Sequence, residues 1–481
     1  MCSTSLWSTQ RVRTISLCHS TGRIAIFICS SHRHAIYQQF WIQTSYWIRA
    51  VPVERIPWSR HYRPTYSVRW GATGPEFSQI SFPVSRHDVL AARPRFYLDH
   101  AATSWPKPPG SLEACIEFQT SNGAAAGRGV YQSAEYSSEL VRTARQTVAR
   151  LLGAPNSHDV AFCSNGTLAL NSAILGLLQS PNMRGSHVVT TATEHNSVLR
   201  PLQLATKTCG ITWTAVQCDA TGWVDPNQIQ ASILANTRLV ILNHVSNVTG
   251  TIQDISSISA MARARDAIFL LDAAQSLGYL PIDVVADGLD VLAAPGHKGA
   301  GGMLGTGILY VRREIQQQME PIWIGGTGTQ SDSIEGPFDW LYAVESGNCN
   351  LPGIASLKAG LEWLEKQKPN DNLQIWTSQI IDSIIQTPNL KLIGPLPGDA
   401  KRNRLPVVSL TCESLSCHEM AMLLDSACGV EARSGYHCAG LIHAFLGTNE
   451  KGGTLRLSLG HTSTPADVEA AIAGIQILGT M

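Results

Sequence analysis

The sequence predicts an α/β protein in which helices cover both faces of a large, mostly parallel sheet, followed by a smaller C-terminal α/β domain. The chain has 481 residues, 44% hydrophobic and 15% charged, enough apolar side chains for the cores of two or three domains. From Phe96 onward short apolar segments alternate with helical stretches, a rhythm typical of βαβα folds. After about Pro352 a long helical stretch leads into a second strand-and-helix segment.

The expected strands are short and apolar, and polar residues follow them closely. They are Val160–Cys163, His187–Thr190, Leu239–Asn243, Ile268–Leu271 and Val291–Ala293. Helices are expected over Leu168–Leu178 and Ile255–Arg265. A further helix, Ile354–Lys368, begins the smaller domain, whose next elements start near Leu390. Open α/β sheets bind ligands beyond the carboxyl ends of their strands, so the polar residues there are the candidate site.

Residues 1–94 differ in composition from the rest of the chain. They contain no lysine and only three acids, and they show no sustained period of two or 3.6 residues. We interpret them as an extension that is disordered or has no part in the site. An organellar presequence and a leader translated upstream of the true start are the alternatives. Residues 95–350 are expected to form the large domain, with its first residues packing on the small domain, residues 351–481.

Charge and cysteine usage narrow the class of protein. Lys and Arg together number 36, as do Asp and Glu, so the formal net charge is zero and nothing favours a nucleic-acid or membrane partner. No apolar run approaches the ~20 residues of a membrane helix. The twelve cysteines form no C-x-x-C pair, which favours reduced thiols over a disulfide frame or a metal site and predicts a cytoplasmic protein.

Two of the expected strands end in turns suited to binding an anion and a ring. Gly166 and Thr167 open a helix after the first strand, where backbone amides and a hydroxyl can bind phosphate. An ordinary helix cap is the alternative. His195 follows the second strand, where a histidine can stack on a planar cofactor and move a proton. A hydrogen-bonded loop histidine is the alternative.

Two further strands end in a carboxylate and an amine. Asp272 follows an apolar strand, where a carboxylate is costly without a partner, and a protonated pyridine nitrogen is such a partner. Gln275 can reach a ring oxygen from the same turn. Lys298, after His297 and beside a glycine-rich run, can bind an aldehyde if its surroundings lower its pKa. The alternatives are that Asp272 caps a helix and that Lys298 is a surface lysine. The order along the chain of the polar groups after these four strands is a stronger signal than any one of them.

Residues 96 to about 480 resemble the class V aminotransferase-type pyridoxal-phosphate (PLP) enzymes, specifically the cysteine desulfurase family. The matching stretches are Tyr97–Thr103, Ala126–Gly129, Glu194–Pro201, Val245–Gly250, Asp272–Gln275, His297–Lys298 and Arg433–Ala439. The resemblance implies the PLP-dependent transferase fold type I and a homodimer. It also implies conversion of L-cysteine to L-alanine, with the sulfur passing through an enzyme persulfide to an acceptor.

The resemblance implies a role for each candidate residue around the cofactor. Lys298 is the Schiff-base lysine, His195 lies over the ring, Asp272 meets the ring nitrogen, Gln275 meets the ring oxygen, Gly166, Thr167 and His297 hold phosphate, and Asn247 lies beside cofactor and substrate. For the substrate, Arg456 matches the arginine that clamps the carboxylate, and Arg433 is placed with it. A planar guanidinium suits such a bidentate contact.

Cys438, in the segment Arg433–Ala439, matches the family nucleophile. A thiolate is the reactive form, and Arg433 and His437 are candidates to stabilise it. The segment resembles the subgroup with an Arg-x-Gly-x-His-Cys-Ala loop, which implies slow turnover alone, stimulation by a small sulfur-acceptor protein, and selenocysteine as an alternative substrate. A selenocysteine lyase, another class V transaminase or epimerase, and a non-catalytic sulfur-transfer partner are the alternative functions.

The chain departs from the family pattern at several places near the lysine. Pro295 stands where relatives often have Ser or Thr, so one phosphate donor is missing. His100 stands where many relatives have Asn, and Ala300-Gly301-Gly302 replaces the usual residues after the lysine. The run Gly325-Gly326-Thr327-Gly328 is a candidate contribution to the phosphate site of a neighbouring subunit.

Overall fold

The computed structural model describes residues 94–127, 129–326, 334, 339–367, 372–399 and 402–481, and five strands within the first 83 residues. The chain divides into two compact units, Met1–Pro94 and Arg95–Met481. In the first unit, β1, β2 and β3 form one antiparallel sheet and β4 and β5 another. Their bounds are Thr14–Ser20, Arg23–Cys29, Trp41–Ile42, Thr65–Trp70 and Ser78–Pro83. The interpretation of residues 1–94 as an extension otherwise lies outside the described residues.

The second unit is built around a seven-stranded sheet with the order β7-β13-β12-β11-β10-β8-β9. Its strands are β7 (Val160–Cys163), β8 (His187–Thr191), β9 (Thr212–Val216), β10 (Thr237–Asn243), β11 (Ile268–Asp272), β12 (Val291–Pro295) and β13 (Gly307–Val311). The five expected strands are confirmed as β7, β8, β10, β11 and β12. All neighbours run parallel except β13, which is antiparallel to β12 and β7. The connection from β12 to β13 lacks a crossover helix, so an antiparallel return is the natural pairing.

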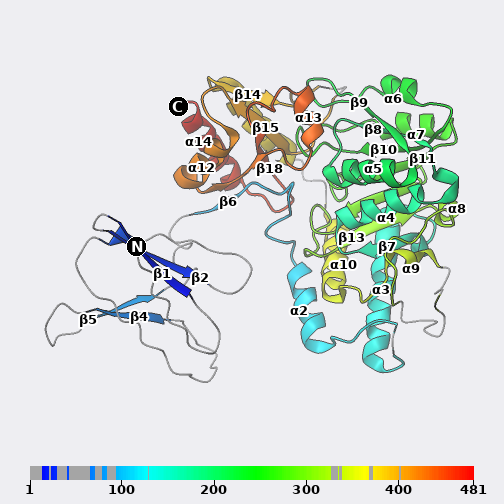
Figure 1. Ribbon diagram of the computed structural model, residues 1–481, viewed down its shortest axis with the longest axis horizontal. Coiled ribbons are helices and arrows are strands. Elements are labelled where there is room, and N and C mark those ends of the chain that lie inside the picture. The colour runs from blue at the N-terminus through cyan, green and yellow to red at the C-terminus, as the bar shows by residue number, and fades with distance from the viewer. Residues whose placement is uncertain are drawn as a thin grey trace. The chain divides into compact units, whose positions relative to one another are not determined.

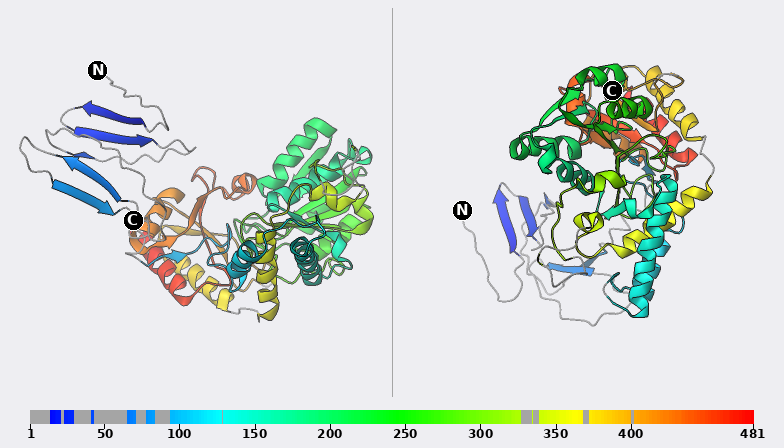
Figure 2. Two further views of the ribbon diagram at one scale, coloured as in Figure 1. Left: turned by 90° about the horizontal axis from the view of Figure 1, so that it is seen from below. Right: turned by 90° about the vertical axis from the view of Figure 1, so that its right-hand side faces the viewer.

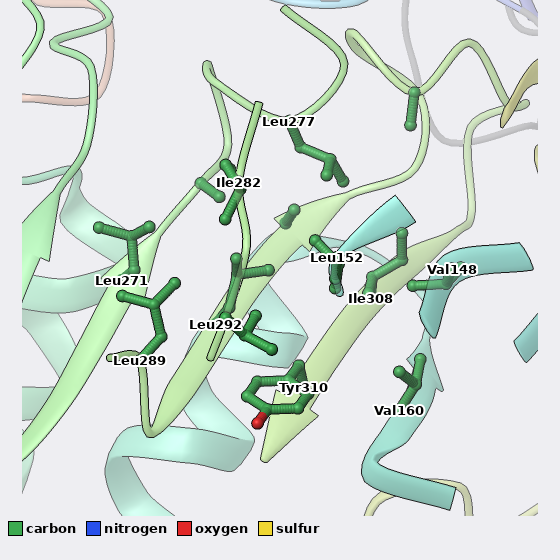
Figure 3. Close-up of a cluster of buried hydrophobic side chains, with 14 of the residues drawn as sticks. Val148, Leu152, Val160, Leu271, Leu277, Ile282, Leu289, Leu292, Ile308 and Tyr310 are labelled. Atoms are coloured by element: carbon green, nitrogen blue, oxygen red, sulfur yellow. The ribbon is translucent and has the colours of Figure 1, made fainter. Parts of the chain in front are cut away.

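Helices cover both faces of this sheet, as predicted (Figure 1). One face packs against α3 (Gln132–Leu151), α6 (Pro226–Ser232), α7 (Ile255–Arg263) and α10 (Leu351–Lys366), the other against α4 (Gly166–Leu178) and α5 (Asn196–Cys209). Side chains alternate between the two cores: Val240 and Leu242 lie in the first, Leu239 and Ile241 in the second. Figure 3 shows part of the first core, where Leu292 and Tyr310 belong to neighbouring strands. Strands buried on both faces explain the continuous apolar runs in the sequence.

The C-terminal part forms a four-stranded antiparallel sheet, β14-β15-β18-β17, with its own core (Figure 2). Its elements are α11 (Asn372–Gln386), β14 (Leu390–Ile393), β15 (Val407–Cys412), α12 (Cys417–Leu423), β17 (Arg433–Gly435), α13 (Gly440–Phe445), β18 (Thr454–Ser458) and α14 (Pro465–Leu478). The early strand β6 (Phe96–Tyr97) pairs with β16 (Val430–Glu431), which ties the start of the second unit to its end.

The remaining helices are α2 (Ser111–Ser121), α8 (Arg313–Gln316) and α9 (Trp340–Val344). Within the described residues, no helix combines the length and apolarity needed to cross a bilayer.

Candidate functional site

The parallel strands bring the predicted cofactor residues to one edge of the sheet. Residues after β7, β8, β10, β11 and β12 all leave the sheet at its carboxyl edge, because these strands share one direction. The groups that follow them are Thr167, His195, Asn247, Asp272, Gln275, His297 and Lys298. Neighbouring strand ends are therefore the scaffold of the candidate site.

The N-terminus of α4 presents free donors. The Asn165 side chain caps the helix by accepting from the Leu168 amide, while no described residue accepts from the backbone N–H of Gly166 or Thr167. The Thr167 hydroxyl lies 2.8 Å from the Ser197 hydroxyl. Gly166 is packed closely against β12, since a Cβ there would lie 3.0 Å from Pro295. Unsatisfied amides at a helix N-terminus suit an anion such as phosphate.

His195 is held in one orientation by its own helix. It is the N-cap of α5, and its Nδ1 accepts from the Ser197 amide at 3.0 Å and lies 2.8 Å from the Ser197 hydroxyl. Burial, assisted by Lys298 and Arg433, lowers the pKa of His195 to about 4. The ring is therefore neutral near pH 7 and carries its proton on Nε2.

Asp272 closes β11 with half of its carboxylate unpaired. Its Oδ1 accepts from the Ala274 amide at 2.9 Å, whereas buried Oδ2 has no hydrogen-bond partner among the described residues. Burial raises the pKa of this carboxyl, while the Ala274 amide and Lys298 oppose that rise. A buried, unpaired carboxylate oxygen is costly, so the site favours a cationic or N–H donor ligand at Oδ2.

The side-chain amine of Lys298 has a lowered pKa and therefore loses its proton more easily than an ordinary lysine. Burial and the positive charge of Arg456 lower the pKa of Lys298 to about 8, against the opposing charge of Asp272. An amine must be neutral to attack an aldehyde, so this shift suits covalent binding of a carbonyl compound.

The peptide before Lys298 is fixed by residues from the start of the second unit. The His297 carbonyl accepts from the Ser104 amide at 3.1 Å, the Ser104 hydroxyl at 3.1 Å, the Thr103 hydroxyl at 3.1 Å and the Lys107 amine at 2.7 Å. The His297 Nδ1 also lies 3.0 Å from the Thr103 hydroxyl. These contacts hold the backbone from which Lys298 projects.

Gln275 is anchored in the same layer. Its Nε2 donates to the Ala101 carbonyl at 3.0 Å, which leaves the second N–H and the side-chain oxygen for a ligand. His100, one residue before Ala101, is buried and lies 3.3 Å from the Ser463 hydroxyl. His100 thus packs against the C-terminal part.

Arg456 is fully buried in β18, where it already forms an ion pair with a carboxylate. Its Nη2 donates to Asp99 Oδ1 at 2.6 Å, and its Nη1 donates to the Asn247 carbonyl at 3.0 Å. Its Nε has no partner among the described residues. The guanidinium is thereby fixed beside Asn247, with N–H groups left over for a second anion.

Cys438 lies exposed at the tip of a loop that is tied to the carboxyl edge of the large sheet, where the predicted cofactor residues lie (the cofactor edge). The Cys438 carbonyl accepts from the Asn196 amide at 2.7 Å, and the His437 carbonyl accepts from the Asn247 side chain at 2.7 Å. The Arg433 Nη2 lies 3.5 Å from the Cys438 sulfur. An exposed thiol beside a permanent cation has the surroundings of a reactive cysteine.

His437 does not act on the thiol as the sequence led us to expect. Its ring is buried, and its Nε2 lies 2.9 Å from the Thr454 hydroxyl. Burial, together with Arg456 and His443, lowers the pKa of His437 far below its ordinary value. The ring is therefore neutral, and among these two candidates only Arg433 supplies a positive charge.

Of the two glycine-rich segments noted in the sequence, the structure describes one fully and the other only in part. In Ala300-Gly301-Gly302, Gly301 adopts a φ of +73°, which favours glycine, and a Cβ there would lie 2.7 Å from Pro108. This segment is a packing element. Of the run that begins at Gly325, the residues Thr327 and Gly328 lie outside the described residues, so the contribution to a neighbouring subunit stays a prediction.

Several residues of the site carried no role in the sequence interpretation. Ser197 links Thr167 to His195, Asp99 pairs with Arg456, and Lys107 bonds the His297 carbonyl. Asp99 and Ser197 lie within the stretches Tyr97–Thr103 and Glu194–Pro201, so their position was a signal. Lys107 follows such a stretch closely, but its partner is evident only from the fold.

Known proteins are similar to this chain in sequence and in fold. A family model, aminotransferase class-V, matches residues 96–471. The probable cysteine desulfurase of Methanothermobacter thermautotrophicus is 31% identical over 390 residues, covering 80% of this chain and 94% of the relative. That of Pyrococcus abyssi is 31% identical over 406 residues, covering 82% and 96%. The apo structure of cysteine desulfurase from Thermococcus onnurineus NA1 superposes with a TM-score of 0.73 at 29% identity, covering 80% and 95%.

Proposed function

Because this chain belongs to the class V aminotransferases and, within them, to the cysteine desulfurase family, we propose that it converts L-cysteine to L-alanine and carries the sulfur as a persulfide on Cys438. The observation that carries the proposal is that the loop of the nucleophile is hydrogen-bonded to the cofactor edge of the sheet. Backbone carbonyls of the Cys438 loop bond Asn196 and Asn247, both at strand ends of the large sheet. An exposed thiol is thereby tied to the same sheet edge that carries Lys298, an amine of lowered pKa.

The residues present fit pyridoxal phosphate. Unpaired Asp272 Oδ2 suits a protonated ring nitrogen, the free amides of Gly166 and Thr167 suit the phosphate with His297, and Lys298 suits the aldehyde. His195 and Gln275 would border the ring. When bound, the cofactor acts as an electron sink that stabilises negative charge on the substrate's α-carbon.

The chain's own residues then orient the amino acid and move its protons. Arg456 binds the α-carboxylate through N–H groups not used by Asp99 and Asn247. Lys298, as a neutral amine, takes the α-proton and later returns a proton to the carbon fragment. Neutral His195 can donate a hydrogen bond from Nε2 to a bound ligand, and the Ser197 amide holds its ring in one orientation.

Cys438 performs the sulfur transfer. Its thiolate, which lies beside Arg433, attacks the substrate sulfur and forms a sulfur–sulfur bond as the carbon–sulfur bond breaks. The electron pair of the broken bond remains with the carbon fragment, which is protonated to alanine. The sulfur stays on the enzyme as a persulfide. Exposure of Cys438 then allows an acceptor thiol to remove it.

We further propose L-cysteine as the substrate, a homodimer, a small sulfur-acceptor protein as partner, and the cytoplasm as location. The last point is supported by the cysteines, since none of the nine described ones forms a disulfide. The exposed position of Cys438 supports a protein acceptor that can reach its sulfur.

The proposed function is tested by incubating the purified, PLP-loaded protein with L-cysteine and a thiol reductant. Alanine and sulfide should form in equal amounts, and mass spectrometry before reduction should find one added sulfur on the peptide that contains Cys438. Absence of alanine, even with candidate acceptor proteins added, would contradict the proposal. L-selenocysteine in a parallel reaction determines the substrate preference.

The lowered pKa of Lys298 predicts how cofactor attachment depends on pH. Only the neutral amine reacts with the aldehyde, so attachment should rise with pH and reach half of its maximum near pH 8, not near the ordinary lysine value of about 10.4. The measurement incubates apoprotein briefly with PLP at pH 6 to 11, reduces with borohydride and quantifies modified Lys298 by mass spectrometry. A midpoint above pH 10 would show that the amine is not perturbed.

The role of Arg456 predicts a specific kinetic defect. Arg456→Lys keeps the charge but loses the planar fork, so KM for L-cysteine should rise about 10- to 100-fold while kcat changes much less. The control is Arg312→Lys, whose exposed guanidinium pairs with Asp290 at the surface and should leave KM unchanged. An unchanged KM in Arg456→Lys would remove Arg456 from substrate binding.

A further inference from the structure

The loop that carries Cys438 is a tight turn in an unfavourable conformation. The Ala439 amide donates to the Tyr436 carbonyl at 2.9 Å, which closes a four-residue turn. Its central residues, His437 and Cys438, have φ values of +50° and +59°. Positive φ at both central positions is the pattern of a type I′ turn, which glycine, asparagine and aspartate favour. Two side chains with a Cβ resist it, so other contacts must hold the turn.

His443 supplies one of those contacts from a position that the reaction does not use. This residue of α13 is fully buried, and its Nε2 lies 3.2 Å from the Tyr436 carbonyl, the oxygen that closes the turn. A carbonyl only accepts, so Nε2 must carry the proton. The Nδ1 then accepts from the Thr448 hydroxyl at 2.7 Å. Both ring nitrogens are satisfied in one neutral form.

The ring of His443 also packs edge-on against that of Tyr436, with centroids 5.2 Å apart and an interplanar angle of 86°. His443 therefore fixes the first residue of the turn through both its backbone and its side chain. The carbonyls of the next two residues are bound from the large sheet by Asn247 and Asn196. Each backbone carbonyl from Tyr436 to Cys438 thus accepts a hydrogen bond from a residue other than His437 and Cys438.

We propose that His443 is a positioning residue for the sulfur-accepting cysteine: by closing the Tyr436–Ala439 turn it keeps the Cys438 sulfur beside Arg433. The proposal rests on the proposed function, which it deepens. Without the Nε2 donor, the central residues of the turn relax toward negative φ. The sulfur then leaves the position 3.5 Å from the guanidinium.

The test compares His443→Leu with His443→Gln in the PLP-loaded enzyme. A glutamine amide can place its N–H close to the position of Nε2. His443→Leu should lower kcat for alanine formation from L-cysteine about tenfold with KM nearly unchanged, and His443→Gln should stay within about threefold of the parent. A second readout is deuterium exchange at the α-carbon of L-alanine, which needs Lys298 but no thiol. Exchange should be equal in all three proteins.

His187→Leu is the matched control. His187 is also buried and bonded through both nitrogens, to Thr237 and Thr214, but it lies in the large sheet. Its kcat should match the parent. Equal loss in both His→Leu variants, or parallel loss of exchange and desulfuration, would overturn the proposal, as would a glutamine variant no better than leucine.

Thr448→Val provides a test if His443→Leu does not fold. It removes only the hydroxyl that donates to Nδ1, and it should lower kcat about threefold without changing exchange. An unchanged kcat in this variant would count against the proposal. If the parent enzyme exchanges the alanine α-proton but makes no alanine from cysteine, the proposed function fails. The rate at which iodoacetamide alkylates Cys438 is then compared between the parent and His443→Leu, which tests the turn proposal separately. Equal alkylation rates would refute it.

Discussion

Replacing Cys438 by alanine is expected to lower alanine formation from L-cysteine by at least about a thousandfold, because no other described thiol lies at the cofactor edge with a cation beside it. Cofactor binding should be unchanged, since the hydrogen-bond partner of the Cys438 sulfur is Arg433, which is not among the residues proposed to hold PLP. Single-turnover measurement of alanine and of protein-bound sulfur tests both points.

Cys115→Ala is the control for this variant. Cys115 is partly buried on α2, away from the strand ends, and its loss should leave the rate unchanged. Full activity of Cys438→Ala toward L-cysteine would contradict the persulfide mechanism. Activity retained only toward L-selenocysteine would instead favour a selenocysteine lyase, in which the substrate's selenium leaves without a protein nucleophile.

Replacing Lys298 by alanine should abolish covalent cofactor retention and lower desulfuration by at least about a thousandfold. The amine is both the proposed attachment point and the proposed base, and its pKa near 8 is not shared by an ordinary surface lysine. Borohydride reduction of the loaded protein, followed by denaturation and mass measurement, should find the cofactor mass on the parent but not on the variant.

Lys358→Ala is the matched control, because Lys358 pairs with Glu362 on the surface of α10. It should retain the cofactor and the full rate. Cofactor mass remaining on Lys298→Ala after denaturation would place the attachment at another lysine and remove the basis of the site.

Much of the fold could be predicted from local sequence. Continuous apolar runs between polar turns predicted the five parallel strands, because strands buried on both faces must be apolar throughout. The antiparallel strand β13 and the edge strand β9 were not predicted. The edge strand alternates between exposed and less exposed residues, and β13 differs from its neighbours only in direction, which a residue pattern does not encode.

The chemistry of the site was readable from the sequence because each strand end carries its own polar group in chain order. Phosphate donors, a ring-stacking imidazole, a carboxylate and an amine are properties of residue types, and the parallel sheet brings them together. By itself the sequence thus determined the fold class and the kinds of groups that we propose to bind the cofactor.

Only the tertiary structure decided which of these groups are charged, paired or strained. Asp99 meets Arg456 across 357 residues in the sequence. Burial, assisted by Arg456, keeps His437 neutral, while Arg433 lies beside the thiol. The turn at Cys438 is likewise held by bonds from His443 and from two distant strand ends. Desolvation and partner geometry depend on how distant segments pack, and no local pattern of residues records that packing.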